Sequence, residues 1–366
     1  MAEWQSSMEG VEVNQGFWHG KRVFLTGHSG FKGGWLSLWL QTMGAEVHGY
    51  ALSPPTETNL FTVAKISKGM ASSEIGDVRD MDKFRHAMQV VRPEIIFHLA
   101  AQPLVRQSYV QPTETYAVNV MGTVHLLEAV RATPGVKAVV NVTTDKCYEN
   151  REWAWGYREG EALGGHDPYS SSKACSELVT TAYRKSFLDA AGVALASARA
   201  GNVIGGGDWA TDRLIPDFLR AMDAGEILKI RSPLSTRPWQ HVLEPLSGYL
   251  MLAERLYLGG AAFAEAWNFG PHDEDARPVR WIVERLAEMR NNVNWKCDET
   301  PQPHEAHYLK LDSSKAHHRL NWQPRWGLEV ALLKTLEWHE AWRKVENMRA
   351  VTLAQIANYQ SESEVH

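Results

Sequence analysis

The sequence has few cysteines, and their spacing does not suit a structural role. Cys147, Cys175 and Cys297 are an odd number without a C-x-x-C motif, which argues against a disulfide framework or a zinc site. Reduced thiols of this kind fit the cytoplasm, where disulfides are rare. Cys147 is best interpreted as a small buried filler.

Long apolar runs and an excess of basic charge are also missing. No stretch approaches the roughly 18 apolar residues of a membrane span. The segment from Met1 to Gln15 is polar and acidic, unlike a secretory signal. A net charge of −5 offers no basic face for nucleic acid. We therefore expect a cytoplasmic protein that binds neither membranes nor nucleic acid.

What the chain does have is length and apolar content. Its 366 residues, 44% hydrophobic and 22% charged, suffice for two domains with a large core. It also contains 15 tryptophans. Tryptophan fills cores, but it also lines pockets that stack rings.

A strand, a glycine-rich loop and a helical pattern follow one another near the start. The β-run Lys21–Thr26 is followed by a loop with glycines at every third position, and apolar residues at helical spacing begin at Trp35. This order is the context of a dinucleotide fingerprint, in which the pyrophosphate lies on the helix N-terminus. It favours cofactor binding over a structural turn, with the predicted contacts Gly27, Ser29, Gly30, Phe31, Lys32 and Gly33.

The choice between NAD and NADP stays open at this stage. A second strand, Ala45–Leu52, carries Tyr50 and is followed by Ser53 where an acid for the adenosine ribose is usual. Lys32 either faces a 2′-phosphate or, as we favour, is a solvated lysine at a helix start. Asp77 either hydrogen-bonds the adenine or caps the helix that begins near Met81.

Two further strands, Pro93–Leu99 and Ala138–Val142, end in residues suited to a site. The first leads into Ala100 and Ala101, whose small side chains let a cofactor lie against the backbone. The second leads into Thr144-Asp145-Lys146. Because open α/β sheets bind ligands at the carboxyl ends of their strands, we expect both segments to border one site.

Tyr169 and Lys173 are four residues apart at the start of a helical pattern. They therefore share one helix face. An ammonium group beside a phenol favours the phenolate and lowers its pKa from about 10. The pair predicts a site that moves protons and hydride.

Repeated strand–helix units from 21 to 200 predict an α/β fold with a doubly wound, mostly parallel Rossmann sheet. We assign 20–200 to an NAD-binding domain, to which 239–258 returns. A smaller mixed α/β substrate domain comprises 201–238 and 259–345, and 1–19 and 346–366 are extensions. Tyr359–His366 is expected to fray. The helices Asn119–Ala132 and Tyr169–Leu188 either form a dimer interface or cover the sheet.

Three arginines of the later half lie among aromatic residues: Arg213, Arg231 and Arg237. Each alone is most simply a surface ion pair. As a set they favour a diphosphate, because the planar guanidinium pairs bidentately with its oxygens.

The glycine loop, the Tyr-x-x-x-Lys pair and the later half together resemble the extended short-chain dehydrogenase/reductase superfamily of nucleotide-sugar enzymes. Four stretches are similar to the CDP-glucose branch of its 4,6-dehydratases, and the resemblance runs from about Gly20 to Trp342. These stretches are Gly30-Phe-Lys-Gly33, Thr144-Asp-Lys-Cys-Tyr-Glu-Asn150, Gly201-Asn-Val-Ile-Gly-Gly-Gly-Asp-Trp209 and Arg237-Pro-Trp-Gln-His-Val242.

The resemblance implies a redox-neutral loss of water in deoxysugar biosynthesis, with catalytic Thr144, Asp145, Lys146, Tyr169 and Lys173. Tyr169 takes the 4-hydroxyl proton as hydride passes from sugar C4 to NAD, and Thr144 shares a hydrogen bond with that hydroxyl. Asp145 is the acid for the leaving 6-hydroxyl, and hydride returns to C6. Lys146 either removes the C5 proton, which needs its pKa to fall by about three units from about 10.4, or stays charged and stabilises the enolate. We slightly favour the base.

The resemblance also implies binding residues and partners. The substrate is CDP-glucose, and the protein is a homo-oligomer, most simply a homodimer, without a metal. Trp209 either packs on the cytosine or belongs to the core. The other cofactor residues are Asp77, Val78, Leu99, Ala100, Ala101, Gln102, Asn119, Thr143, Tyr169 and Lys173. The substrate residues are Gln102, Asn202, Trp209, Arg213, Arg231 and Arg237.

Three rival functions stay open. A UDP-sugar 4,6-dehydratase is the nearest, since some carry the same Thr-Asp-Lys triplet. A nucleotide-sugar 4-epimerase is less favoured, because it needs no acid and base for water loss. A catalytically silent NAD-binding regulator is disfavoured because Tyr169 and Lys173 are both intact.

Overall fold

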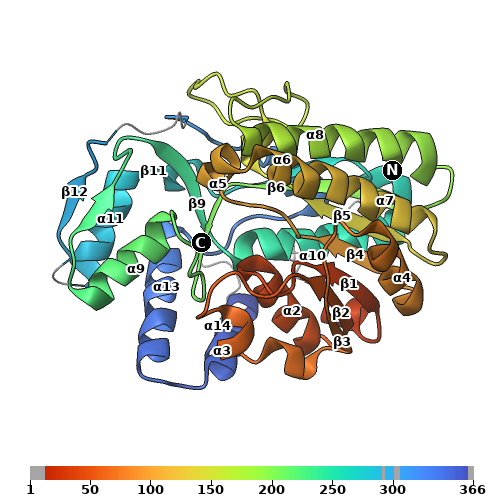
Figure 1. Cartoon of the computed structure of the whole chain (residues 1–366), viewed down its shortest axis with the longest axis horizontal. Coiled ribbons are helices and arrows are strands. Elements are labelled where there is room, and N and C mark those ends of the chain that lie inside the picture. The colour runs from red at the N-terminus through yellow and green to blue at the C-terminus, as the bar shows by residue number, and fades with distance from the viewer. Residues whose placement is uncertain (1–12, 291–292, 301–305, 362–366) are drawn as a thin grey trace, which may run out of the picture.

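A seven-stranded parallel sheet forms the centre of the molecule (Figure 1). The computed structural model describes residues 13–290, 293–300 and 306–361. Neighbouring strands pair in parallel throughout, so the predicted doubly wound fold is confirmed. In sheet order the strands are β10 (Ala266–Phe269), β6 (Ala194–Ala200), β5 (Ala138–Val142), β4 (Ile95–His98), β1 (Arg22–Thr26), β2 (Glu46–Ala51) and β3 (Ser72–Ile75).

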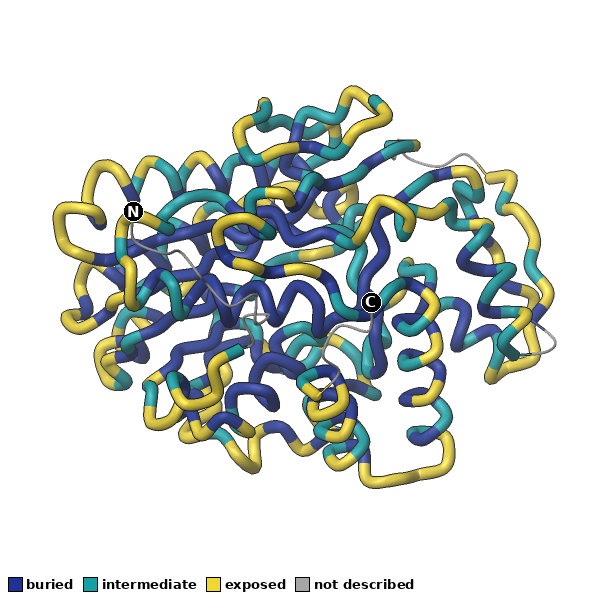
Figure 2. The backbone as a smooth tube through the Cα atoms, turned by 180° about the vertical axis from the view of Figure 1, so that it is seen from behind, coloured by how far each residue is buried: buried dark blue, intermediate teal, exposed yellow. Residues whose placement is uncertain are grey.

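Apart from the exposed edge strand β3, the sheet buries apolar side chains on both faces, because successive strand residues point to opposite sides and both kinds are apolar. Val23 and Leu25 pack into one core with α2 and α10, whereas Phe24 packs into a second core with α4 and α7. The tube in Figure 2 is accordingly dark blue along the sheet and yellow at the peripheral loops. The helices of the part that contains this sheet, from α1 to α10 with α9 left for the smaller part, are α1 (Gln15–Trp18), α2 (Phe31–Thr42), α3 (Leu60–Val63), α4 (Met81–Val91), α5 (Val105–Val110), α6 (Pro112–Tyr116), α7 (Gly122–Arg131), α8 (Pro168–Tyr183) and α10 (Leu243–Gly259).

The two long helices expected from the sequence each contain a stretch of π-helix. Ala117–Met121 precedes α7, and Arg184–Leu188 continues α8. Such insertions recur at functional sites. The first contains Asn119, whose role is described below.

A smaller part of the molecule lies on the left in Figure 1, at the end away from strands β1, β2 and β3. It has its own core, in which Phe218, Leu286 and Leu336 are buried. Its elements are the sheet β11-β9-β7 (Ala276–Pro278, Thr236–His241, Asn202–Ile204), the pair β12-β8 (Trp295–Cys297, Leu228–Ile230), and the helices α9 (Leu214–Ala224), α11 (Val279–Met289) and α13 (Leu328–Arg343).

Later segments return to the large sheet. β10 lies in the stretch 259–345 that the sequence places in the substrate part, yet it pairs with β6. The helix α12 (Ser314–Leu320) packs beside β10. Strand β10 is only four residues long, and its partner is distant in sequence, so no local pattern reveals the pairing.

The expected fraying at the end is wrong as far as Ser361. Helix α14 (Met348–Ser361) packs against α13 and α2. Tyr359 is buried, and its hydroxyl donates a hydrogen bond of 2.8 Å to Glu244 Oε2. The structure does not describe residues 362–366. It also does not describe residues 1–12, which make up most of the segment that the sequence analysis distinguished from a secretory signal. Within the described ranges, no helix is both long enough and apolar enough to cross a bilayer.

Candidate active site

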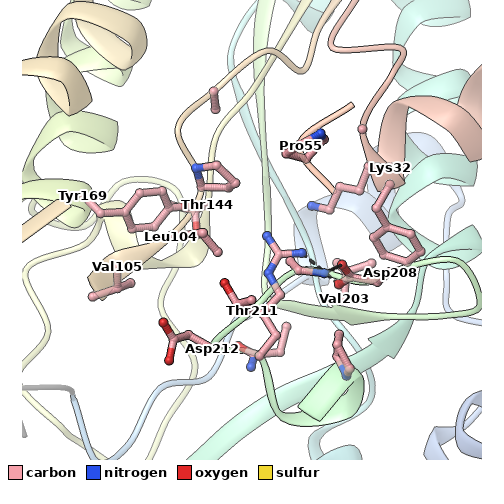
Figure 3. Close-up of a pocket in the computed structure, with 18 of the residues that line it drawn as sticks. Lys32, Pro55, Leu104, Val105, Thr144, Tyr169, Val203, Asp208, Thr211 and Asp212 are labelled. Atoms are coloured by element: carbon pink, nitrogen blue, oxygen red, sulfur yellow. Dashed lines mark hydrogen bonds and ion pairs between the residues drawn. The ribbon is translucent and has the colours of Figure 1, made fainter. Parts of the chain in front are cut away.

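A cavity of about 680 Å³ opens at the carboxyl ends of the central strands. The large sheet supplies one wall, and β7, α9 and the segment after β8 supply the other. Figure 3 shows the two walls facing each other, with Lys32, Thr144 and Tyr169 from the sheet side and Asp208 and Asp212 from the smaller part. The site is therefore at the edge expected for an open α/β sheet.

The glycine loop forms the floor of one end of this cavity. Gly27 has φ +76°, and a Cβ there would lie 2.8 Å from the Ala100 amide nitrogen. A Cβ on Gly33 would collide with the Gly27 carbonyl oxygen. Gly30 is the N-cap of α2, so the first turn of this helix borders the cavity. A loop that only glycine fits, leading into a helix N-terminus, suits a cofactor pyrophosphate.

Lys32 is not the solvated lysine that the sequence favours. It lines the cavity, where burial lowers its pKa to about 8. The positive charges of Arg213 and Lys173 add to this effect, and Asp145 opposes it. Lys32 therefore belongs to the interior of the site.

Asp77 does not cap the following helix. Its carboxylate accepts hydrogen bonds from Arg79 at 2.6 and 2.9 Å, which hold the pKa of Asp77 below its usual value. Asp80 is the N-cap of α4 instead. Asp77 still lines the cavity, as do Val78, Leu99, Ala100 and Ala101.

Gln102 and Asn119 hold the wall together and do not line the cavity. The Gln102 side chain accepts a hydrogen bond from the Leu104 amide at 2.6 Å and donates to Thr115 Oγ1 at 2.9 Å. Asn119 exchanges hydrogen bonds with the Gln102 backbone and donates to Ser172 Oγ. Both residues therefore lie behind the cavity wall, and their direct contacts with a ligand stay predictions.

Asp145 is a buried carboxyl group at the end of β5. Thr144 Oγ1 donates a hydrogen bond of 2.9 Å to Asp145 Oδ1, and Oδ2 has no partner among the described residues. Burial raises the pKa of Asp145, while Lys146 and Thr144 oppose the shift. A carboxyl whose protonated form is favoured by burial in this way is suited to act as an acid.

Tyr169 and Lys173 share a helix face beside this carboxyl, as predicted. Tyr169 is hydrogen-bonded to Thr144, and Lys173 Nζ donates to the Val142 carbonyl at 3.3 Å. The expected fall in the Tyr169 pKa is wrong, however. Burial raises the pKa of Tyr169 to about 12 and lowers that of Lys173 to about 8. Desolvation is the largest cause of both shifts, and it outweighs the hydrogen bond from Thr144 that lowers the Tyr169 pKa and the charge of Glu177 that raises the Lys173 pKa.

A buried ion pair lies beneath the catalytic residues, and the sequence analysis missed it. Glu177 accepts hydrogen bonds from Thr143 Oγ1 at 2.5 Å, Ser197 Oγ at 2.6 Å and Arg199 Nη2 at 2.8 Å. Burial alone would raise the Glu177 pKa, but Arg199 and these donors hold it below its usual value. The sequence did contain a signal for Glu177: it lies four residues after Lys173, on the same helix face as Lys173 and Tyr169.

The predicted substrate residues converge on the opposite wall, where Asn202, Trp209, Arg213, Arg231 and Arg237 all line the cavity. Arg213 Nη1 lies 2.9 Å from Asp208 Oδ2. Arg237 is buried on β9. The carboxylate partners Asp208 and Asp212 were not predicted.

Trp209 is both a wall residue and a core residue. Its ring contacts those of Trp338 and Trp342 edge-on, with centroids 5.6 and 5.3 Å apart. It also lines the cavity. Cys147 is fully buried, as expected for a filler.

The doubly wound sheet, the glycine loop and the Tyr169/Lys173 pair define a nucleotide-binding enzyme of the extended short-chain dehydrogenase/reductase type. The described residues contain no cluster suited to a metal ion. The chain belongs to the GDP-mannose 4,6 dehydratase family, which matches residues 24–335.

Individual relatives agree with this assignment. A CDP-glucose 4,6-dehydratase of Salmonella typhimurium is 57% identical over 355 residues, which cover 95% of this chain and 99% of the relative. A dTDP-glucose 4,6-dehydratase of Xanthomonas campestris is 25% identical over 334 residues, which cover 86% of this chain and 92% of the relative. The fold is shared with a dTDP-glucose 4,6-dehydratase from Streptomyces venezuelae solved with NAD (TM-score 0.75, 24% identity, covering 89% of this chain and 98% of that one).

Proposed function

We propose that the protein is an NAD-dependent nucleotide-sugar 4,6-dehydratase that converts CDP-D-glucose into CDP-4-dehydro-6-deoxy-D-glucose. The observation that carries this proposal is the shared cavity of Asp145, Tyr169 and Lys173. Moving a proton and a hydride requires only the Tyr169/Lys173 pair. Expelling water also requires an acid, and the buried Asp145 carboxyl supplies one.

The glycine loop is suited to the cofactor. Gly27 and Gly33 let the loop pack closely against the neighbouring backbone, and the first turn of α2 offers its free amides to a pyrophosphate. When bound, NAD takes a hydride from sugar C4 and returns it at C6. We assign NAD binding to the residues predicted above, except that Gln102 and Asn119 shape the wall from behind.

Tyr169 and Thr144 act on the 4-hydroxyl group. The hydrogen bond between these two residues places both oxygens at one point of the cavity. Tyr169 accepts the hydroxyl proton as its phenolate, and the positive charge of Lys173 stabilises that phenolate. The 4-ketone that results makes the C5 proton acidic.

Asp145 and Lys146 expel water from C5 and C6. Burial raises the pKa of Asp145 and so favours its protonated form, which donates its proton to the departing 6-hydroxyl. We assign removal of the C5 proton to Lys146, which follows Asp145 and lines the same cavity. The alternative is a charged Lys146 that only stabilises the enolate.

Replacing Lys146 by methionine separates these two roles. A base role predicts loss of C5–H exchange with deuterated solvent in Lys146→Met, whereas Lys146→Glu, which restores a base, keeps it. The general-base contribution is typically about 10²–10⁴-fold. Exchange that persists in Lys146→Met would exclude the base and leave the electrostatic role.

The substrate wall suits a nucleotide diphosphate. Arg213, Arg231 and Arg237 present guanidinium groups to one cavity, and such groups pair bidentately with phosphate oxygens. The 57% identity to a CDP-glucose enzyme supports cytidine over uridine or thymidine.

The direct test is product analysis with CDP-, dTDP-, UDP- and GDP-hexoses. CDP-glucose is expected to give a 4-keto-6-deoxy sugar, detected by its absorbance in alkali, without net consumption of coenzyme. Preferential conversion of a UDP-sugar would reassign the nucleotide. An epimerised hexose, or no reaction with any sugar, would refute the dehydratase.

We also propose a cytoplasmic homodimer that pairs through the face formed by α7 and α8. Met121, Leu178 and Phe187 expose 46%, 59% and 41% of their surface along this face. Large apolar side chains grouped on one surface mark an interface. Light scattering should give a dimer that Leu178→Asp dissociates, and a monomeric wild type would contradict the proposal.

A further inference from the structure

Two arginines from different parts of the fold meet at one carboxylate oxygen at the edge of the cavity. Arg106 Nη1 and Arg231 Nη1 each lie 3.0 Å from Asp212 Oδ1. Arg231 also donates to the Asp212 carbonyl at 3.1 Å. All three residues line the cavity. Arg106 belongs to α5 on the sheet side, whereas Asp212 and Arg231 belong to the substrate side.

The ion pair between Arg106 and Asp212 is easily replaced by a contact with another anion. Arg106 and Asp212 are 46% and 42% exposed, and exposed ion pairs contribute little to stability. Asp212 has φ +61°, in the left-handed region that non-glycine residues seldom adopt. In Figure 3 its carboxylate points toward Val105, the first residue of α5. Asp212 therefore contacts Arg106 across the mouth of the cavity while its own side chain stays partly exposed.

Two guanidinium groups that converge on one point need an anion between them, because their like charges repel. Asp212 supplies one carboxylate. A diphosphate brings more charge and more acceptor oxygens, and it forms bidentate, charge-assisted hydrogen bonds with both arginines.

We propose that Arg106 and Arg231 form an anion subsite for the diphosphate of the nucleotide sugar, and that Asp212 occupies this subsite as an internal competitor. Arg106 is then a substrate-binding residue that lies outside the predicted arginine set. Diphosphate binding releases Asp212 and joins the two walls of the cavity through the ligand. The identity of the ligand rests on the proposed function, whereas the subsite itself requires only a diphosphate.

The test is calorimetric binding of CDP, cytidine and inorganic pyrophosphate to the full-length chain saturated with NAD, so that the glycine loop is occupied. Arg106→Gln is expected to weaken CDP and pyrophosphate by about tenfold, as for loss of a charged hydrogen bond, and to leave cytidine unchanged. Asp212→Asn keeps the size but loses the charge, so it should tighten CDP by about threefold. Arg85→Gln is the matched control, since Arg85 has a similar exposure and pairs with Asp82 at 2.8 Å away from the cavity.

The alternative is that the three residues form only a structural clamp. In that case Arg106→Gln and Asp212→Asn would both weaken CDP, or Arg106→Gln would match Arg85→Gln, and either result overturns the proposal. Thermal unfolding of each variant shows that the fold is intact. If pyrophosphate binding responds as expected but CDP binds no better than other nucleotides, the subsite stands and the proposed nucleotide fails.

Discussion

The two walls of the cavity are built by different means. On the sheet side, close backbone contacts at Gly27 and Gly33 and buried side chains such as Asp145 and Glu177 position most of the candidate catalytic groups. On the substrate side, Arg237 is buried, but Arg213 and Arg231 are partly exposed and are held by ion pairs with Asp208 and Asp212. The first wall is preorganised by packing. The second is held by contacts that a charged ligand can replace, so substitutions should affect chemistry on one wall and affinity on the other.

Two buried carboxylates sharpen this contrast within the sheet side. Burial raises the pKa of Asp145, which has one hydrogen-bonded oxygen and one without a described partner. Glu177 is equally buried, but Arg199 and two hydroxyl donors hold its pKa below the usual value. Burial therefore favours the protonated form of Asp145, whereas Arg199 favours the charged form of Glu177, which fixes Thr143 in position.

The largest effect is expected from Tyr169→Phe, which removes the group that accepts the 4-hydroxyl proton. Turnover of CDP-glucose should fall by about 10⁴-fold, at the upper end for general acid–base groups. The Kd for CDP should change little, because the substrate wall is untouched. Tyr183→Phe on the same helix is the control, and should retain activity. A variant that still exchanges the C5 proton at the wild-type rate would show that another residue starts the reaction.

The next effect concerns stability. Glu177→Gln leaves the Arg199 guanidinium buried without its carboxylate, and breaking one partner of a buried pair costs about 3–5 kcal/mol. Chemical denaturation should show this loss. Glu128→Gln breaks the more exposed pair with Arg131 and should cost at most about 1 kcal/mol. Equal losses in the two variants would mean that burial does not distinguish these pairs.

The sheet side was largely predictable because its signals are local. A strand, a glycine loop and a helix follow one another from Arg22 to Thr42, and the step from Tyr169 to Lys173 is one helical turn. The contacts that were missed join distant segments. Gln102 meets Asn119, and Arg106 meets Asp212, through the tertiary fold alone. The raised Tyr169 pKa also escaped prediction, because a sequence shows that Lys173 is near but not how deeply both side chains are buried.

A smaller effect is expected from pH. Burial lowers the Lys173 pKa to about 8, and the protonated form is the one that stabilises the Tyr169 phenolate. The Tyr169 pKa is about 12, so the state with a Tyr169 phenolate beside a protonated Lys173 gains population about tenfold per pH unit up to the Lys173 pKa. Above that pH the gain in phenolate is cancelled by the loss of the Lys173 proton, so activity should rise up to about pH 8 and then level off. Lys32 has a similar pKa, so Lys32→Met identifies the group. The break in the kcat/KM profile near pH 8 should persist in this variant, and its disappearance would assign the break to Lys32.

The smallest effect is expected from Trp209→Phe, which tests whether the substrate wall contains any packed group comparable to the sheet side. Edge-on contacts with Trp338 and Trp342 anchor the ring from behind. Loss of part of this packing should lower the free energy of unfolding by about 1–2 kcal/mol. KM for CDP-glucose should change less than about threefold, as for loss of a weak aromatic contact. Trp342→Phe is the matched control, because Trp342 shares the cluster without lining the cavity. If Trp209→Phe alone raised KM tenfold, the ring would be a platform for the cytosine, and the substrate wall would owe its affinity to packing as well as to charge.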